Sequence, residues 1–527
     1  MLQHRNTTLV HAAQERAEKH GDEIAIYFDD GSTLSYGEAW ADGLALAGAL
    51  YERGLRPRDR VSFQLPNCRE SVVVMLAAAI GGWVINPIVP IYRDRETGYI
   101  LRHAGSKAIF IPTSIRGFDY PAMVGRLRAD CAELTTVVVI GADEDTDDQH
   151  CTYAQLLRSG YTLPHPPHEA DPDDVKILLY TSGTTGHPKQ VRHSHNSLTA
   201  ALDLGVIGWN LGDDDLMLMP SPVTHITGYV NGMELPFLTG TKSLLMGQWQ
   251  VDRAIDLIEQ YGATACVSAT PFLRELVDAC QAADKSLPGF RLFACGGASV
   301  PPDLIHDAWN TLRDCRAVRV YGSTEVPLVT VGFTGADQRT LAAETDGRIS
   351  DYEVKVVDED GRDVGLDKDG EILARGAAMM LGYGDPEQNS DAFDGNGFFR
   401  TGDIGRKLAN GGLLITDRKK DIIIRGGENI SARDIEEVLL RMEGVAEVAV
   451  VSVPHQRLGE TVGACLVMTD GRPLDQQALV TMLRDSGLAK QKWPQHIEFM
   501  SALPKTASGK VQKEILRRQL REQGIVV

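Results

Sequence analysis

The sequence predicts a doubly wound α/β fold with a smaller α+β domain at its C-terminal end. Short apolar strands alternate with helix-length segments up to about residue 416, a pattern typical of sheets covered by helices on both faces. Several strands end in small or polar residues, where ligands of such sheets bind. The pattern changes after Asp417. We therefore expect an N-terminal domain over residues 1–419 and a C-terminal domain over residues 420–527.

The first 170 residues supply the opening strands and helices. Their periodicity and turn residues predict a helix over 9–20, a hairpin over 24–36, a helix over 36–54 with a glycine stop, a strand over 59–65, a helix over 71–80 and strands over 107–112 and 135–141. Residues 71–92 carry no charge and are about long enough to span a bilayer. Because Gly81-Gly82, Asn86-Pro87 and Pro90 divide them, we expect a buried helix followed by a strand.

The remaining chain divides into two patterns. Short apolar strands are predicted within 215–222, 241–246, 263–270, 291–298 and 317–325. After Lys420 we expect a helix over 431–442, strands over 446–454 and 462–469, a helix over 475–486 and a basic helix after Lys510. An acidic solvated loop over 141–150 and a proline-rich connector over 163–174 complete the predicted elements.

Size and charge restrict the class of protein. A chain of 527 residues is too long for one compact core, and 43% hydrophobic with 24% charged residues is ordinary for a globular protein. The net charge of −19 repels nucleic acid and anionic lipid, so any polyanionic ligand needs local cations. The eight cysteines have no zinc spacing, and charges interrupt the N-terminal segment, so we expect a cytoplasmic protein with reduced thiols and no secretory signal.

The segment "TSGTTGHPK" (Thr181–Lys189) is built to hold an anion. An apolar strand gives way there to hydroxyls and glycines and then to Lys189. Glycines allow backbone N–H groups to converge on phosphate oxygens, while the hydroxyls and the lysine add donors and charge. The spacing differs from the ordinary P-loop. Taken alone, a solvated Ser/Thr/Gly hairpin explains such a segment equally well.

Five strings, in this order, resemble the signatures of the adenylate-forming (AMP-binding) superfamily. They are "TSGTTGHPK" at 181, "YGSTE" at 321, "TGD" at 401, "DRKKDIIIRGGENIS" at 417 and "PKTASGKVQK" at 504. The resemblance spans essentially the whole chain and is nearest to the acyl-CoA and aryl-CoA synthetase branch. It implies a large N-terminal domain of doubly wound sheets with a β-barrel-like subdomain, and a small mobile C-terminal domain.

The resemblance implies an acid–thiol ligase that uses ATP, Mg²⁺ and CoA. A carboxylate would attack the α-phosphorus of ATP, giving acyl-AMP and pyrophosphate, and CoA thiolate would then displace AMP. Charge that develops at phosphorus requires cations and oriented donors already in place. The resemblance accordingly implies an ATP-binding acyl-CoA synthetase, a ligase that serves fatty acid metabolism.

Roles for individual residues follow from the resemblance. The triphosphate would be held by Thr181, Ser182, Gly183, Thr184, Thr185, Gly186 and Lys189, and the adenine and nearby nucleotide atoms by Gly297, Ala298, Tyr321, Gly322, Ser323 and Thr324. Thr184 and Glu325 are the expected metal residues, because Mg²⁺ prefers hard oxygen ligands. Without the preceding residues "YGST", Glu325 would be interpreted as a surface glutamate.

The C-terminal strings supply the ribose site, the hinge and the catalytic lysine. Asp403 resembles the acid that accepts both ribose hydroxyls, and Arg418 a second ribose contact. Lys510 matches the lysine that bridges the substrate carboxylate and the α-phosphate, and Lys420 occupies the hinge position. A domain rotation would then replace Lys510 by the Gly426-Gly427 loop, which would line the CoA tunnel.

The acyl pocket is expected to run from His225 and Tyr229 to Gly297 and Gly322. By resemblance, His225 gates this pocket; a hydrogen-bonded core histidine is the alternative. No acid follows His225 directly, where amino-acid-activating relatives carry an aspartate, so the sequence favours an apolar medium-chain, alicyclic or aryl acid. One departure from the family is Gln190, which follows Lys189 where glycine is usual and affects the return path of the loop.

Other readings remain open at this stage. An adenylating enzyme could load its acyl group onto a separate carrier protein, and a nucleotide-binding regulator could have lost catalysis. The H-x-H of His193 and His195 suggests a metal site, although no third ligand is nearby. The expected partners are a small carboxylic acid, ATP and CoA, without nucleic acid or an integral membrane segment; a homodimer is left open.

Overall fold

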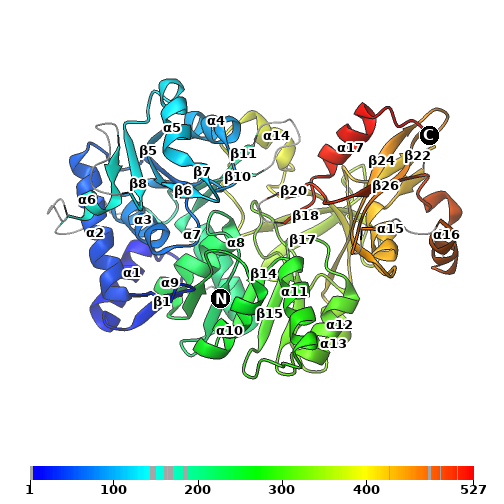
Figure 1. Ribbon diagram of the computed structural model, residues 1–527, viewed down its shortest axis with the longest axis horizontal. Coiled ribbons are helices and arrows are strands. Elements are labelled where there is room, and N and C mark those ends of the chain that lie inside the picture. The colour runs from blue at the N-terminus through cyan, green and yellow to red at the C-terminus, as the bar shows by residue number, and fades with distance from the viewer. Residues whose placement is uncertain are drawn as a thin grey trace.

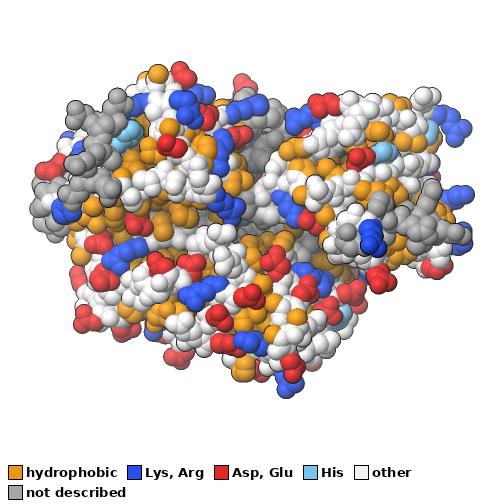
Figure 2. All heavy atoms as spheres, in the orientation of Figure 1, with side chains coloured by type: hydrophobic (Ala, Val, Ile, Leu, Met, Phe, Trp, Pro, Cys, Tyr) orange, Lys and Arg blue, Asp and Glu red, His pale blue; other side chains and the backbone are white. Residues whose placement is uncertain are grey.

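A computed structural model describes most of the chain. The described residues are 4–142, 150–158, 163, 166, 170–181, 188–426, 428–469, 471–472, 476–486, 488–506 and 509–527. A large body holds the N-terminal elements, and the C-terminal elements lie at one end of the molecule, beside strands β17, β18 and β20 (Figure 1). On the face in Figure 2, acidic and basic side chains are interspersed over both parts.

Two predominantly parallel sheets form the body. The seven-stranded sheet has the order β16-β15-β14-β12-β13-β1-β2, and all its pairings are parallel except that of β1 with β2. Its strands are β1 (Ile24–Phe28), β2 (Thr33–Ser35), β12 (Leu216–Met219), β13 (Lys242–Leu245), β14 (Ala265–Ser268), β15 (Leu292–Gly296) and β16 (Arg316–Val320). The strands expected in the second half of the chain are thereby confirmed.

The eight-stranded sheet has the order β19-β11-β10-β4-β3-β5-β8-β9. Its strands are β3 (Arg60–Phe63), β4 (Val84–Pro87), β5 (Ser106–Pro112), β8 (Thr136–Ile140), β9 (Cys151–Thr152), β10 (Val175–Thr181), β11 (Lys189–Ser194) and β19 (Gly382–Tyr383). Strands β10 and β11 pair antiparallel, from Thr181 with Lys189 to Val175 with Ser194. The expected strand, turn and strand therefore flank the anion-loop sequence.

Helices cover the faces of these sheets (Figure 1). In the N-terminal domain they are α1 (Leu9–His20), α2 (Tyr36–Glu52), α3 (Arg69–Ile80), α4 (Asp94–Ala104), α5 (Tyr120–Leu127), α6 (Tyr153–Leu157), α7 (His195–Trp209), α8 (Ile226–Gly228), α9 (Leu235–Thr239), α10 (Val251–Tyr261), α11 (Thr270–Ala282), α12 (Pro302–Thr311), α13 (Arg339–Glu344) and α14 (Glu387–Ala392). Three shorter elements are the 3₁₀ helix η1 (Arg128–Asp130), the π-helix η2 (Tyr229–Glu234) and the hairpin of β6 (Ser114–Ile115) with β7 (Phe118–Asp119).

Capping residues explain several helix boundaries. The Thr8 side chain accepts a hydrogen bond from the His11 N–H at the start of α1, and Ser35 with Glu38 forms a capping box at the start of α2. Helix α2 ends before Gly54, whose φ of 91° lies in the left-handed region. These caps occur where the sequence predicted starts and stops.

The uncharged segment 71–92 forms helix α3, Gly81-Gly82 and strand β4. Every residue of α3 from Ser71 to Ile80 is buried, which explains the lack of an amphipathic pattern. Among the described residues no helix combines the length and the apolar character needed to cross a membrane.

The subdomain expected to resemble a β-barrel is an antiparallel sheet of four strands. They are β17 (Tyr352–Val357), β18 (Gly370–Gly376), β20 (Phe399–Lys407) and β21 (Leu413–Arg418), in that spatial order. In this order β17 and β21 are the edges, so the pairings of the described strands do not close a barrel. The pairing of β20 with β21 sets Asp403 opposite Arg418.

The C-terminal elements have a sheet and a hydrophobic core of their own. They are β22 (Ile423–Arg425), β23 (Glu428–Ile430), α15 (Ala432–Leu439), β24 (Val445–His455), β25 (Gly459–Met468), α16 (Gln476–Asp485), η3 (Lys490–Lys492), β26 (His496–Met500) and α17 (Lys513–Glu522). Helix α15 is shorter than predicted, because its last turn tightens into i→i+3 hydrogen bonds from Arg441 to Val438 and from Met442 to Leu439. The separate core accords with the predicted two-domain organisation.

Candidate active site

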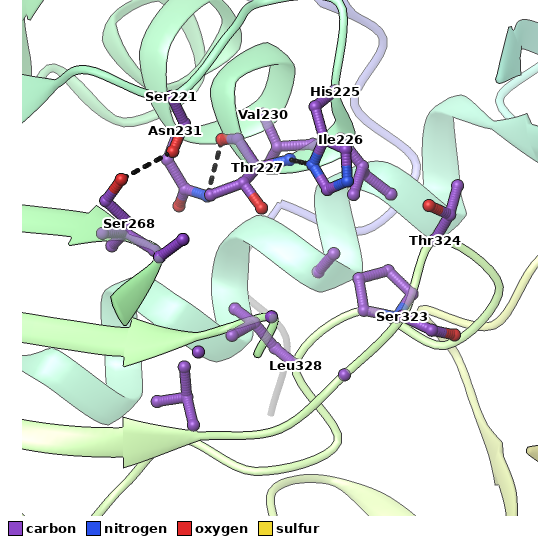
Figure 3. A pocket seen from close by; sticks show the side chains of 18 of the residues that line it. Ser221, His225, Ile226, Thr227, Val230, Asn231, Ser268, Ser323, Thr324 and Leu328 are labelled. Atoms are coloured by element: carbon purple, nitrogen blue, oxygen red, sulfur yellow. Dashed lines mark hydrogen bonds between the residues drawn. The ribbon is translucent and has the colours of Figure 1, made fainter. Parts of the chain in front are cut away.

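One cavity of about 930 Å³, open to solvent, lies at the carboxyl ends of four neighbouring strands (Figure 3). Its lining comes from residues that follow β12, β14, β15 and β16, from α8 and η2, and from the C-terminal domain. The lining residues that carry the argument are Ser221, His225, Thr227, Val230, Asn231, Ser268, Phe272, Gly297, Tyr321, Gly322, Ser323, Thr324 and Lys510. The cavity thus lies where the sequence directed the search, at the carboxyl ends of these strands.

Glycines shape one wall of this cavity. Gly297 has a φ of +80°, and a Cβ there would lie 3.7 Å from Cε of Lys510. A Cβ on Gly322 would lie 2.5 Å from the backbone N of Leu328, which is closer than real contacts allow. Gly322 is therefore required by packing, whereas Gly297 keeps the space beside Lys510 open.

Tyr321, Asp403 and Arg418 form a connected group beside the cavity. The Tyr321 hydroxyl donates to Oδ2 of Asp403 at 2.6 Å, and Nε of Arg418 lies 2.9 Å from Oδ1 of the same carboxylate. The Asp403 charge raises the pKa of Arg418, while burial and then Asp403 raise the pKa of Tyr321. Tyr321 and Arg418, from two separate sequence motifs, thus meet at the Asp403 carboxylate of a third.

Lys510 reaches the same cavity from the C-terminal domain. Its backbone N–H donates to Oγ1 of Thr506 at 3.1 Å, and the Thr506 N–H donates back to the Lys510 carbonyl at 2.7 Å. Burial, followed by the positive charge of Arg418, lowers the pKa of Lys510 to about 8. The Lys510 ammonium is therefore the cationic side chain that lines this cavity.

Glu325 is held by a residue that the sequence reasoning missed. The Tyr383 hydroxyl donates to Oε1 of Glu325 at 3.0 Å, and Nζ of Lys189 lies 4.6 Å from the centroid of the Tyr383 ring. Tyr383 belongs to β19, which pairs with β11 next to Lys189. A lone tyrosine in "LGYG" carries no recognisable signal, because this role arises only from strand pairing.

Glu325 suits the expected Mg²⁺. One of its oxygens accepts the Tyr383 hydrogen bond, and the other accepts no hydrogen bond from the described residues. A carboxylate with a free oxygen near a phosphate site matches the hard-oxygen preference of Mg²⁺. Nevertheless, no group of three or more His, Cys, Asp or Glu side chains in the described part of the chain could hold a metal alone.

His225 lines the cavity, whereas Tyr229 does not. Burial and then the Lys510 charge lower the pKa of His225 to about 4, so its ring is neutral at pH 7. Its Nδ1 accepts the Thr227 N–H at the start of α8. The expected pocket end at Tyr229 is wrong, because this side chain is fully buried behind the wall near Glu234.

The anion loop is only partly described. Thr181 and Lys189 pair with each other at the ends of β10 and β11, but Ser182, Gly183, Thr184, Thr185 and Gly186 lie outside the described residues. Gln190 keeps its place in the ladder opposite Tyr180, and its amide donates to the Tyr180 hydroxyl at 2.6 Å. The departure from glycine at this position therefore leaves the strand pairing intact.

The H-x-H pair has structural roles. Nε2 of His193 donates to the Thr324 carbonyl at 2.7 Å, and His193 Nδ1 lies 2.9 Å from Oγ of Ser197. Nδ1 of His195 accepts the Leu9 N–H. Both rings are buried and in contact with protein groups, so they resemble core histidines and position the "YGST" turn through Thr324.

Lys420 and Gly426 lie outside the cavity lining, as do Ala298, Arg418 and Asp403. Lys420 is exposed, and its carbonyl accepts from Nη2 of Arg517 in α17. Gly426 has a φ of 61° in the turn between β22 and β23, and Gly427 lies outside the described residues. The structure thus brings Lys510, and not Gly426, to the cavity.

Comparison with known proteins supports one family over most of the chain. The model of the AMP-binding enzyme family matches residues 13–384, and that of the AMP-binding enzyme C-terminal domain matches residues 434–510. The medium-chain fatty-acid–CoA ligase of Escherichia coli (strain K12) is 32% identical over 512 residues, covering 96% of this chain and 89% of that protein.

Two further relatives differ in what their names describe. The salicyl-AMP ligase / salicyl-S-ArCP synthetase of Mycobacterium tuberculosis (strain ATCC 25618 / H37Rv) is 30% identical over 506 residues, covering 92% of this chain and 85% of that protein. The crystal structure of ATP-bound MatB from Rhodopseudomonas palustris superposes with a TM-score of 0.85 at 26% identity, covering 98% of this chain and 100% of that one.

Proposed function

Because the chain belongs to the AMP-binding enzyme family, we propose that it is an ATP-dependent carboxylic acid–CoA ligase. It forms acyl-AMP and pyrophosphate, and then acyl-CoA and AMP. The observation that carries this proposal is the single cavity that joins Tyr321, Gly297 and Lys510 at one side to the apolar side chains of Val230, Val267 and Phe272 at the other. Such a cavity can hold a nucleotide and a carboxylic acid against each other.

In the first half-reaction Lys510 stabilises negative charge. The acid's carboxylate oxygen forms a bond to the α-phosphorus of ATP, and the bond from that phosphorus to the bridging oxygen of pyrophosphate breaks. The Lys510 ammonium, beside the open space at Gly297, neutralises charge on the carboxylate and the phosphoryl oxygens. A neutral His225 adds no further positive charge beside the carboxylate.

The nucleotide is held by the groups around Asp403. We propose that Asp403 accepts hydrogen bonds from the ribose hydroxyls, with Arg418 and Tyr321 fixing its two oxygens. The Tyr321 ring and the backbone at Gly297 and Ala298 enclose the adenine, with Gly322, Ser323 and Thr324 alongside. Lys189 and the loop Thr181–Gly186 hold the β- and γ-phosphates, and Thr184 with Glu325 binds Mg²⁺, which would supply charge neutralisation between phosphates.

The second half-reaction needs a different placement of the C-terminal domain. Lys510 lines the cavity, and we propose that its side chain occupies the space that a pantetheine arm needs to reach the acyl group. We propose that a rotation about Lys420 withdraws Lys510 and brings the Gly426-Gly427 turn to the cavity, where CoA thiolate attacks the acyl carbon and AMP leaves. We assign the present placement of Lys510 to the adenylation step.

The substrate is proposed to be a medium-chain, alicyclic or aryl acid with a mainly apolar body. Of the described side chains that line the cavity, Lys510 alone is charged at pH 7, so an α-ammonium finds no counter-ion among them. Relatives named for medium-chain fatty acid, indoleacetate and naphthoate CoA ligation accord with an apolar body. Fatty acid metabolism and a cytoplasmic location are further proposals; eight free cysteines accord with a reducing compartment.

A carrier-protein acceptor is the alternative function. The similarity to a salicyl-S-ArCP synthetase favours it, because that name describes transfer to a carrier protein. The first half-reaction and its residues are the same for both acceptors. The two differ only in what carries the thiol to the rotated domain.

The test is to measure AMP and pyrophosphate release with a panel of carboxylic acids, ATP and Mg²⁺, with CoA present or omitted. With CoA present, we expect acyl-CoA to form together with AMP. With CoA omitted, we expect only the exchange of pyrophosphate with ATP. If a phosphopantetheinyl carrier protein becomes acylated and no CoA thioester forms, the CoA ligase proposal is overturned and the carrier-protein acceptor is favoured. The homodimer stays a prediction, which sedimentation velocity tests separately.

A further inference from the structure

The end of the cavity away from Ser323 and Thr324 is polar, although its walls are apolar. Asn231, Ser221 and Ser268 gather there (Figure 3). Their exposed fractions are 6%, 7% and 4%, so these polar groups are buried within the protein and face the cavity. Buried polar side chains usually have their hydrogen bonds completed. A donor or acceptor that stays free on these three residues therefore indicates a ligand group.

The amide of Asn231 has a defined orientation. Its Nδ2 donates to the Thr227 carbonyl at 3.1 Å. A backbone carbonyl only accepts, so the atom beside it must be the nitrogen, and Oδ1 points the other way. Oδ1 accepts no hydrogen bond from the described residues, and it is not among the fully enclosed atoms. Asn231 therefore presents an acceptor to the cavity.

The two serines present a donor. Oγ of Ser221 and Oγ of Ser268 lie 2.9 Å apart, so one hydroxyl donates to the other. The hydrogen of the accepting hydroxyl is not used in that contact, and neither Oγ has another hydrogen bond with the described residues. One hydroxyl hydrogen therefore remains for a ligand beside the free Oδ1 of Asn231.

A ligand hydroxyl satisfies both groups at once. It can donate to Asn231 and accept from the serine pair, whereas a ketone or ether oxygen only accepts and a methyl group does neither. A second carboxylate or an ammonium would lack a counter-ion, because none of the described side chains at this end of the cavity is charged. The chemistry of the three side chains therefore selects a neutral group that both donates and accepts.

We propose that the acid activated here carries a hydroxyl group on the part of its apolar body that reaches the end of the cavity away from Ser323 and Thr324. Asn231, Ser221 and Ser268 recognise that hydroxyl, while Val230, Val267 and Phe272 enclose the body. This inference rests on the proposed ligase function and deepens it, because it names the substituent that the acyl pocket selects.

The experiment compares matched acids that differ by one hydroxyl. Octanoate is paired with its omega-hydroxy derivative and phenylpropanoate with its para-hydroxy derivative, and kcat/KM is measured from pyrophosphate release. We expect the hydroxylated member of at least one pair to be favoured by roughly tenfold to a hundredfold, because the other member leaves buried polar groups unpaired.

Variants connect this preference to the three side chains. Asn231→Leu keeps a similar volume and should reduce the ratio to about one or below, and Ser268→Ala should reduce it in the same direction. Thr224→Val is the matched control: it removes a buried hydroxyl that has no hydrogen-bond partner among the described residues and lies outside the cavity lining, and its ratio should equal that of the wild type.

The outcomes separate this inference from the ligase function. Release of pyrophosphate with equal kcat/KM for both members of every pair, unchanged in Asn231→Leu, would overturn the hydroxyl inference and leave the ligase intact. Absence of pyrophosphate release with every acid would overturn the proposed function itself. Should Asn231→Leu fail to fold, as judged by loss of ATP-dependent thermal protection, Ser268→Ala decides the matter.

Discussion

Lys510 shows how a single residue depends on its surroundings. Burial and the Arg418 charge disfavour its ammonium form, whereas the carboxylates of Glu325 and Asp403 favour it. The balance leaves the pKa of Lys510 at about 8, below its ordinary value of 10.5. At pH 7 the side chain is mainly charged, and it loses that charge as the pH rises through 8.

This pKa predicts an alkaline limit for adenylation. Because the charged form is required, kcat/KM for ATP should fall by about tenfold per pH unit above the pKa of Lys510 in the free enzyme. Lys510→Arg should be slower but keep its activity flat to higher pH, since a guanidinium stays protonated. Initial rates of pyrophosphate release between pH 6 and about 10 check this; identical alkaline limbs in both enzymes would contradict the assignment.

At the scale of elements, the π-helix η2 connects the acyl pocket to the anion loop. It carries Val230 and Asn231 on the cavity side, and Glu234 at its end pairs with Lys176 of β10, the strand that leads into the loop. The Lys176 and Glu234 side chains are 5% and 0% exposed, so the pair is buried. A π-helix is a rare element that occurs often at functional sites, and here an ion pair fixes its end.

Removing one partner of the Lys176–Glu234 pair should destabilise the protein more than replacing both partners. Lys176→Met leaves the Glu234 carboxylate buried without its partner, at a cost of about 3–5 kcal/mol, whereas Lys176→Met/Glu234→Leu replaces both charges and should cost less. We expect the single variant to have the lower apparent Tm by differential scanning calorimetry. Lys285→Met, which removes an exposed pair with Glu259, serves as control and should change Tm little. A double variant less stable than the single one would contradict this.

At the scale of the whole molecule, contacts between the domains hold Lys510 in the cavity. Nη1 of Arg433 in α15 donates to the Ile415 carbonyl of β21 at 2.6 Å, and its Nη2 lies 3.8 Å from Asp346. The Ala432 N–H also donates to Oδ2 of Asp417 at 2.9 Å. The proposed rotation about Lys420 would break the Arg433 contacts, so we expect them to favour the placement of Lys510 that we propose for adenylation.

Arg433→Met should therefore affect the two half-reactions differently. Asp346 keeps its partner Arg319, whereas the partly exposed Glu437, whose Oε1 accepts from Nε of Arg433 at 3.0 Å, loses that partner and can be solvated instead. We expect adenylation to slow by about tenfold, from loss of a charged hydrogen bond, and thioester formation from supplied acyl-adenylate to be unchanged or faster. Single-turnover measurements of each step check this, with Lys510→Ala as the reference that impairs adenylation alone.

Arg441→Met is the matched control for that measurement. It removes an exposed ion pair with Asp303 across the same domains, worth about 0–1 kcal/mol, and should alter neither step appreciably. Equal losses in both steps for Arg433→Met would show that the contact stabilises the protein without selecting between poses.

The family could be recognised from the sequence because its signatures lie in contiguous strings. Lys510, Glu325 and Asp403 each lie in a short motif whose residues are fixed by local geometry, and strand ends in an α/β sheet converge at one edge. The expected pocket end at Tyr229 was wrong, because its side chain, the first of the π-helix η2, is fully buried and lies outside the cavity lining.

The sequence by itself determined the α/β architecture, the strands and most helix boundaries, because these follow from local periodicity, capping and short-range spacing. Its five motifs determined the family, and the two-step chemistry and the roles of the motif residues are what membership of that family implies. Only the tertiary structure decided that Tyr383 supports Glu325, that Lys510 lies in the cavity, and that Asn231 meets Ser221 and Ser268. Those partners are joined by strand pairing, domain placement and a π-helix, and no local pattern encodes contacts made across such distances in the chain.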